Sequence, residues 1–148
     1  MSLTGSLTAR RIILKRTLLA LLLTSVWTCA GSPSAASATA QTGTWGGTHI
    51  ALDVAATSAH LEFDCAHADI ATAFTLDGNN AFDLTGTYVR EHGGPIRPGT
   101  PPDSHPASFT GTVSRDRMTL TVRLTDSGDA MGTFALVHGS PGEVFKCL

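Results

Sequence analysis

Two residues able to do chemistry, Cys65 and His67, stand two positions apart in the stretch LEFDCAHADI (61–70). A thiolate and an imidazole at this spacing can share a metal ion, or the imidazole can activate the thiolate as a nucleophile. The cysteine can instead be one half of a disulfide, with the histidine a bystander. The choice depends on the compartment in which the chain folds and on its other cysteines.

The N-terminal residues 1–28 have the pattern of an export signal. A basic segment (10–16) precedes the apolar stretch TLLALLLTSVW (17–27), which is too short to span a bilayer with both flanks. The basic segment fits a twin-arginine signal and a general secretory signal equally well. Residues 29–43 predict a flexible tether or the end of the signal. They contain Ala38-Thr39-Ala40, an A-x-A pattern, and a cut after Ala40 would leave residues 41–148.

Cys29 leaves the manner of release open. A cysteine that follows the apolar stretch and precedes a tether of small residues is how a bacterial lipoprotein begins, but the preceding Trp27-Thr28 lacks the small residue that lipid attachment favours. Cys29 is therefore discarded with the signal, lies in a released soluble chain, or carries a lipid anchor. We expect an exported protein, periplasmic or extracellular, and alternatively an outer-membrane lipoprotein.

The charge of the exported part argues against two classes of partner. All 12 acidic residues lie beyond residue 50 and four of the ten basic residues lie in the signal, so the net charge is 6 − 12 = −6. This acidic domain is not expected to bind nucleic acid, because nucleic-acid binding requires a clustered basic face. It is also not expected to bind an anionic membrane surface, so membrane contact is expected only through the signal or a lipid on Cys29. The remaining length predicts one domain, residues 44–148, and we expect a monomer.

Export favours the disulfide interpretation of Cys65. The exported domain has two cysteines, Cys65 and Cys147, and an even pair in a small exported domain is typically oxidised. Closing a loop of this length stabilises a fold by roughly 4–5 kcal/mol in the chain-entropy interpretation. We therefore predict a Cys65–Cys147 disulfide, which leaves His67 to be explained separately.

Beyond residue 44 the pattern is one of apolar and polar residues in alternation, broken by frequent turn signals. This pattern predicts an all-β domain, a small antiparallel eight-stranded meander barrel with one disulfide. Cys65 and His67 are in phase with Phe63, and Cys147 with Phe145, so both sulfurs and the imidazole of His67 are expected to point inward. The residues expected to face the core are Ile50, Leu52, Val54, Leu61, Phe63, Phe74, Leu76, Phe82, Leu84, Tyr88, Phe109, Val113, Met118, Leu120, Val122, Leu124, Phe134, Leu136 and Phe145.

Two resemblances accompany this pattern. Gly43-Thr44-Trp45 resembles the G-x-W that starts lipocalins and avidin-like barrels, which bind small molecules in the barrel mouth. That resemblance implies a late-strand arginine packed over Trp45, and the only candidate for this place is a lysine, Lys146. TWGGTH, DCAH, EHGGP and the terminal KCL resemble a group of small uncharacterised exported bacterial proteins. This second resemblance implies an exported single domain and no particular activity.

The segment HGGPIRPGTPPDSHP (92–106) holds five of the seven prolines and three glycines. It is too long for a hairpin turn, and such loops are often functional, although a rigid solvated crossover is the plainer interpretation. We expect a mouth formed by residues 44–49, 67–70 and 90–106. The candidate ligand contacts in it are Trp45, His49, His67, Arg90, His92 and Arg97.

The histidines allow a second hypothesis. His49, His67, Glu91 and His92 could converge as ligands of a first-row divalent metal, although no motif spacing supports this and hydrogen-bonded histidines at strand ends are the plainer interpretation. No nucleophile elbow or phosphate loop is present, so no catalytic residue and no cofactor is predicted. We expect a non-enzymatic protein that binds a small molecule, a metal ion or an envelope partner. The alternatives are a metal-dependent hydrolase and a structural or inhibitory envelope protein acting through residues 92–106.

Overall fold

A computed structural model describes residues 38–94 and 99–147. The predicted export signal, Cys29 and Arg97 lie outside these residues. Within the described ranges every regular element is a β-strand, and no helix is present that could cross a membrane. The strands are β1 (Ala38–Thr39), β2 (Gly43–Gly47), β3 (Ile50–Val54), β4 (Ala59–Phe63), β5 (Ala66–Ile70), β6 (Thr75–Leu76), β7 (Ala81–Arg90), β8 (Asp103–Ser114), β9 (Arg117–Leu124) and β10 (Ala130–His138).

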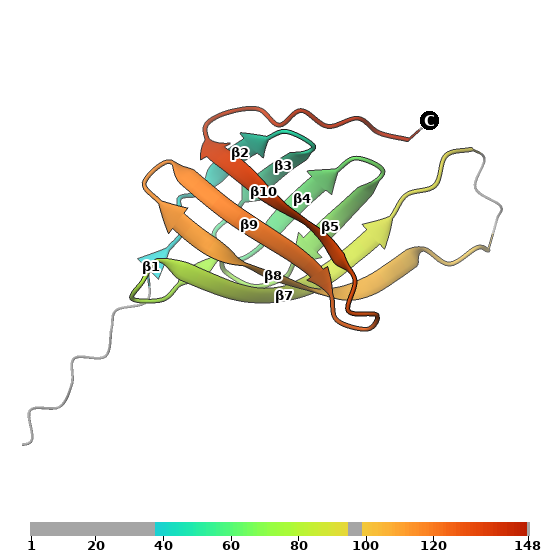
Figure 1. Cartoon of the computed structure of the whole chain (residues 1–148), viewed down its shortest axis with the longest axis horizontal. Helices are drawn as coiled ribbons and strands as arrows, with labels where there is room; N and C mark the ends of the chain where they lie inside the picture. Colours follow the sequence, from blue (N-terminus) through green and yellow to red (C-terminus); the bar gives the residue numbers. More distant parts are fainter. Residues whose placement is uncertain (1–37, 95–98, 148) are drawn as a thin grey trace, which may run out of the picture. The chain divides into compact units, whose positions relative to one another are not determined.

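Eight of these strands close into an antiparallel barrel in the order β10-β2-β3-β4-β5-β7-β8-β9 (Figure 1). Neighbours in the barrel follow one another along the chain, apart from the closing pair and the short β6 that intervenes between β5 and β7, so the barrel is a meander. The short strands β1 and β6 pair separately as a two-stranded sheet. The predicted fold class is thereby confirmed, as is the Cys65–Cys147 disulfide.

The barrel closes through a narrow seam. β7 and β8 pair over ten residues on each strand, from Ala81 opposite Thr112 to Arg90 opposite Asp103. β10 and β2, in contrast, pair only at Val137–Gly46 and His138–Trp45. The first and last barrel strands are therefore joined by far fewer backbone hydrogen bonds than the strands in the middle of the meander.

The interior of the barrel is a continuous apolar core. Alternate residues of each strand point inward, as the sequence pattern predicts, and buried residues such as Phe109, Leu120 and Val122 have no exposed surface. No polar or charged residue of the described chain is buried. Burying each large side chain of this kind contributes about 1.5–3 kcal/mol. The interior is therefore a scaffold that is filled with its own side chains.

The stretch 61–70 is a hairpin and not a single strand. β4 ends at Phe63, Asp64 and Cys65 form a two-residue turn, and Phe63 pairs with Ala66 at the start of β5. Cys65 occupies the left-handed region with φ 53°. The turn shifts the alternation by one residue, so Ala66 and Ala68 face the core and His67 faces outward. The expectation that Cys65 and His67 point into the barrel is wrong.

The chain after β10 is also not a strand. Residues 139–147, which we call the tail, run along the outside of β2 and reach the β4–β5 turn (Figure 1). Gly139 donates to Thr44 at 2.7 Å, and Glu143 donates to Gly47 at 3.0 Å. Phe145, expected in the core, is 69% exposed. The disulfide consequently lies on the surface, where it fastens the tail to the turn.

A glycine lets the tail approach the barrel. Gly46 faces outward from β2, and a Cβ placed on it would lie 2.3 Å from the backbone of Pro141. Any side chain at Gly46 would therefore displace the tail. The glycine in this part of the TWGGTH motif is required by the close contact between the two backbones.

The fold extends further toward the N-terminus than predicted. The flexible segment was expected to continue through residue 43, but β1 begins at Ala38, and Ala40 is buried in the core cluster. The proline-rich loop is shorter than expected, because β8 already begins at Asp103 and includes Pro106. Pro106 pairs with Thr87 of β7, but the pairing of β8 with β9 begins only at Ala107. The missing N–H of Pro106 therefore interrupts no hydrogen bonds between β8 and β9.

Candidate functional site

The polar chemistry of the molecule gathers at one end of the barrel, which we call the loop end. Here β4 turns into β5, β7 leaves for the long loop, β8 returns from it, and the tail arrives. A pocket of ≈ 740 Å³ opens between the end of β7 and the start of β8. Its lining residues are His67, Val89, Arg90, Glu91, His92, Gly93, Gly94, Thr100, Pro101, Pro102, Asp103 and Cys147.

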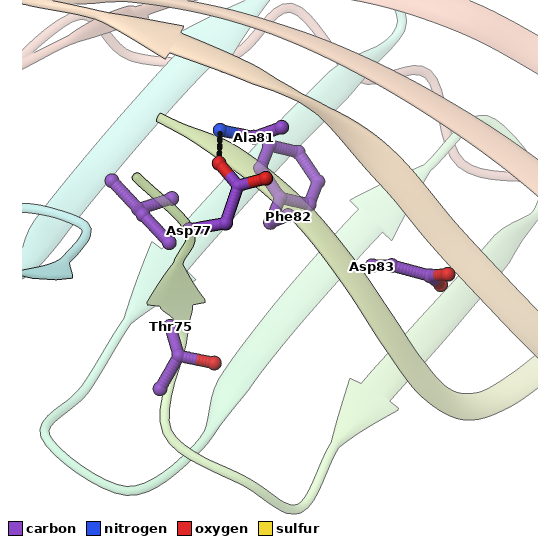
Figure 2. A pocket seen from close by; sticks show the side chains of 6 residues that line it. Thr75, Asp77, Ala81, Phe82 and Asp83 are labelled. Carbon is purple, nitrogen blue, oxygen red and sulfur yellow. Dashed lines mark hydrogen bonds between the residues drawn. The ribbon is translucent and has the colours of Figure 1, made fainter. Parts of the chain in front are cut away.

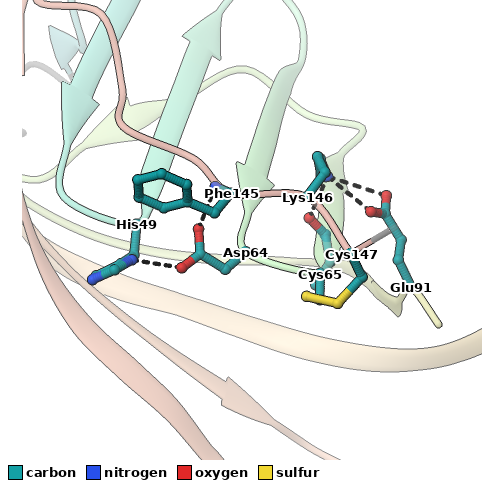
Figure 3. The surroundings of a disulfide bond; sticks show 8 residues. His49, Asp64, Cys65, Glu91, Phe145, Lys146 and Cys147 are labelled. Carbon is teal, nitrogen blue, oxygen red and sulfur yellow. Dashed lines mark hydrogen bonds and ion pairs between the residues drawn. A yellow bond between two sulfur atoms is a disulfide. The ribbon is translucent and has the colours of Figure 1, made fainter. Parts of the chain in front are cut away.

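The disulfide forms one wall of this end (Figure 3). Cys65 and Cys147 have Cα atoms 4.9 Å apart, and Cys147 itself lines the pocket. Beside it, Asp64 accepts the backbone N–H of Phe145 at 2.7 Å with one oxygen, and its other oxygen lies 2.5 Å from Nδ1 of His49. The two-residue turn thus holds the tail both covalently and through its carboxylate.

Lys146 forms the second attachment of the tail. Its ammonium group donates to the carbonyl of Ala66 at 3.0 Å and to both oxygens of Glu91, at 3.2 and 3.0 Å (Figure 3). It also pairs with Glu62 of β4. Lys146 therefore joins the outward-facing Glu62 of β4 and the backbone of β5 to the residue that follows β7.

Two histidines extend this cluster over the outer face of β4 and β5. His67 Nδ1 lies 2.8 Å from Glu91, while His60 lies 2.7 Å from Asp69 and 2.9 Å from Glu62. The two imidazole rings have centroids 6.1 Å apart. The imidazoles, carboxylates and Lys146 form a connected set, in which each carboxylate has at least one positive or titratable partner.

These contacts shift the proton affinities of the cluster. Hydrogen bonds to His67 and Lys146 lower the pKa of Glu91. Partial burial opposes ionisation of Glu62, but hydrogen bonds to Lys146 and His60 outweigh it, and the pKa of Glu62 is lowered. Hydrogen bonds to Asp69 and Glu62 raise the pKa of His60. The ion pairs favour charged carboxylates and a protonated His60.

A second group of pairs lies on the β8 side of the pocket. Asp103 lies 3.2 Å from Nε2 of His92 and 3.0 Å from Nε2 of His105, and His105 Nδ1 lies 2.7 Å from Asp126 in the β9–β10 turn. The hydrogen bond to Asp126 raises the pKa of His105, and the one to His105 lowers the pKa of Asp103. His105 thereby connects the start of β8 to the neighbouring turn.

The structure brings some of the predicted ligand contacts together and separates others. His67, Arg90 and His92 line the pocket together with Glu91, but His92 is an exposed loop residue and does not line the barrel interior. His49 pairs with Asp64 and is not a lining residue. Trp45 is 0% exposed, so the predicted ligand contact at Trp45 is wrong. Arg97 lies outside the described residues.

The expected mouth formed by 44–49, 67–70 and 90–106 is also wrong, because β2 and β5 run along the barrel and only one end of each lies near the loop. The expected partner of Trp45 is different as well. Its ring packs against His138 with centroids 4.9 Å apart, and its Nε1 donates to the carbonyl of Gln41 at 3.0 Å. Lys146 lies in the cluster with Glu62 and Glu91 instead.

The predicted metal set does not assemble. His49, His67 and His92 each pair with a different carboxylate, Asp64, Glu91 and Asp103 respectively. Among residues 38–94 and 99–147, no group of three histidine, cysteine or acidic side chains is placed to hold a metal ion. The arrangement is one of separate histidine–carboxylate pairs.

Sequence reasoning missed several residues of this end, namely His60, Glu62, Asp64, Asp103, His105 and Lys146. A signal was available for some of them, because cross-strand pairs follow from the hairpin register once the turn at Asp64-Cys65 is known. In that register His60 is opposite Asp69, and Glu62 is opposite His67.

A smaller hollow of ≈ 330 Å³ lies between β6 and β7 (Figure 2). Of its two acidic residues, Asp77 and Asp83, Asp77 is already engaged, since one carboxylate oxygen accepts the N–H groups of Asn79 and Ala81, both at 2.8 Å. Asp77 therefore organises its own turn. This hollow offers less chemistry than the pocket at the loop end.

No protein-family model, curated protein or solved structure matches this chain.

Proposed function

We propose that this protein is a non-enzymatic binding module that acts outside the cytoplasm and holds a small amphiphilic molecule at the loop end. The observation that carries the proposal is the pocket of ≈ 740 Å³ between β7 and β8, a volume in the range of small-molecule sites. In this proposal the barrel is the scaffold and the loop end is the recognition surface.

The filled interior supports this location. Trp45, Leu61 and Phe109 have no exposed surface, and no charged side chain of the described chain is buried in the barrel to orient a ligand. A ligand held inside would have to displace core side chains, and eight-stranded barrels have room for their own side chains or for one small ligand. The loop end needs no such displacement, because its pocket is already open.

The lining of the pocket supports an amphiphilic ligand. Val89, Pro101 and Pro102 offer apolar surface, and Gly93 and Gly94 line the pocket without side chains. Arg90, Glu91 and Asp103 place charges at the same site. Small-molecule sites characteristically combine a largely apolar lining with a few polar groups that fix the orientation of the ligand.

The disulfide supports a location outside the cytoplasm. Disulfides persist in oxidising compartments and are rare where glutathione and thioredoxin keep thiols reduced. Here the bond fastens the tail that forms one wall of the pocket, so the proposed site depends on an oxidised Cys65–Cys147 pair. The export pattern of residues 1–28 agrees with this compartment.

The test is a ligand screen read by backbone amide shifts. Isotopically labelled oxidised protein is mixed with a library of small amphiphilic molecules, and the expected binders shift the amides of residues 89–94 and 100–103. Val89→Arg should abolish these shifts by filling the pocket. Thr87→Arg is the matched control, because Thr87 is an exposed residue two positions earlier on the same strand and is not part of the lining.

Two results would contradict the proposal. Binders that shift only amides of the barrel interior would place the site inside the scaffold. Equal affinity of the same binder for the Val89→Arg and Thr87→Arg variants would show that the ligand does not bind in the pocket. A ligand whose binding requires an added divalent metal would return the hydrolase alternative to consideration.

A further inference from the structure

The N-terminal residues of the described chain are built into the fold. Ala38 and Thr39 of β1 pair with Leu76 and Thr75 of β6. Ala40 follows them, is only 3% exposed, and donates its N–H to the carbonyl of Phe74 at 2.9 Å. This segment therefore contributes both a strand and a core residue.

The two residues after Ala40 are anchored as well. The carbonyl of Gln41 accepts the Nε1–H of Trp45 at 3.0 Å, and the carbonyl of Thr42 lies 3.1 Å from Nε2 of His138. The indole N–H of the buried Trp45 thus has its partner in this segment. The position of Gln41 depends in turn on the residues that precede it.

A cut after Ala40 would damage this arrangement. It would remove β1, open the space that Ala40 fills, and leave the carbonyl of Phe74 without its partner. It would also create a charged amino group on Gln41, next to the fully buried indole of Trp45. A buried polar group that loses its partner and an added charge both destabilise a fold.

We propose that export processing occurs upstream of Ala38, so that Ala38-Thr39-Ala40 stays in the mature protein as part of the fold. The A-x-A pattern at these positions then reflects the small residues that the packing needs, and it is not the cleavage site. This inference rests on the export that is part of the proposed function.

The first test determines the N-terminus of the mature chain. The full chain is expressed in a bacterial host, the protein is purified from outside the cytoplasm, and its intact mass and N-terminal peptide are measured. We expect an N-terminal residue upstream of Ala38. Ala38→Leu places a bulky side chain at the first alanine of the A-x-A pattern, and processing should be unchanged.

A second test uses stability to report whether the segment is retained. In the exported full-length protein, Ala40→Asp should lower the Tm by about 5 °C or more, because it buries a carboxylate. Ala38→Asp is the matched control, since Ala38 is exposed, and it should leave the Tm nearly unchanged. Neither substitution can affect a mature protein that starts at Gln41.

The outcomes separate the inference from its premise. A mature N-terminus at Gln41, failed processing of Ala38→Leu, or equal Tm values for the two Asp variants would overturn the inference while leaving export intact. Uncleaved protein confined to the cytoplasm would overturn the export premise and the inference with it.

Discussion

Inside the barrel, Phe109 and Leu120 are surrounded by apolar neighbours with no buried polar side chain among them, whereas at the loop end Lys146, Glu91 and His67 contact one another through charge and hydrogen bonds. The interior contributes stability through burial. Substitutions there should therefore lower the free energy of unfolding by a large amount that does not depend on pH. The loop end contributes less per contact, because exposed ion pairs are worth little. It contributes instead the arrangement of the proposed binding surface.

The strongest way to test this contrast is to remove one aromatic from each region. Phe109→Ala should lower the free energy of unfolding by about 4 kcal/mol, because it leaves a cavity in a fully buried site. Phe145→Ala, at a 69% exposed residue of the tail, should change it by no more than about 0.5 kcal/mol. Urea denaturation of the two variants measures both values. Equal losses would contradict the assignment of Phe145 to the surface.

The second test concerns the Cys65–Cys147 disulfide at the loop end. Cys147→Ser should lower the free energy of unfolding by about 4 kcal/mol, since the bond spans a sequence separation of 82 residues. The reduced wild-type protein is the control and should have the same stability as the variant. If Cys147→Ser were as stable as the oxidised protein, the tail would have to be held by its hydrogen bonds alone.

The third test separates the tail from the barrel without touching the disulfide. Gly46→Val should lower the free energy of unfolding by about 2 kcal/mol, because its side chain would occupy the position of Pro141. Thr44→Val, at an exposed residue on the same face of β2, should stay within about 0.5 kcal/mol. The measurement is again urea denaturation. A well-tolerated valine at Gly46 would mean that the tail does not lie on β2.

The smallest effect is the pH dependence of the loop end. His60 and His105 have pKa values raised above 6.5, so their pairs stabilise the fold below pH 6.5 and this stabilisation is lost as pH rises through the raised values. Glu62 and Glu91 have pKa values lowered from 4.5, so their contribution is present above pH 4.5 and is lost as pH falls through the lowered values.

The Tm should consequently be highest between pH 4.5 and 6.5. Replacing both His60 and His105 by glutamine should flatten the decline above this window. His138→Gln is the control, because His138 lies beside the backbone carbonyl of Thr42 and has no carboxylate partner among the described residues. A Tm that keeps rising above pH 7 would show that the histidine pairs do not contribute to stability.

The barrel, its meander order and its disulfide were predictable because they depend on alternation, turn signals and cysteine count. The predicted number of eight strands was correct although the set was not. The segments 43–54 and 61–70 each contain a turn and form two barrel strands apiece, whereas 74–76 pairs outside the barrel and 145–147 is tail. The alternation pattern counts 43–54 and 61–70 as one strand each, and it counts 74–76 and 145–147 as barrel strands. The two strands missed and the two strands added cancel in the total.

The site was less predictable because it depends on register. A two-residue hairpin turn is usually predicted from Asn-Gly or Asp-Gly in the sequence, but here the turn is Asp64-Cys65 and the residue with positive φ is Cys65. Missing that turn moves every later side chain of the segment to the opposite face, which is why His67 was expected inside. The contacts of Lys146 with Glu62 and Glu91 depend on the path of the tail, which no local sequence pattern encodes.

The narrow seam between β10 and β2 has a consequence for aggregation. A closed barrel exposes no strand edge on which another chain could add, and this protection is only as good as its weakest junction. Opening the two pairs at Gly46 and Trp45 would free one edge of β2 and one of β10. The tail continues past this junction, and its hydrogen bonds to Thr44 and Gly47 keep it along β2. Reduction of Cys65–Cys147 would release that cover and open a route to strand exchange between molecules.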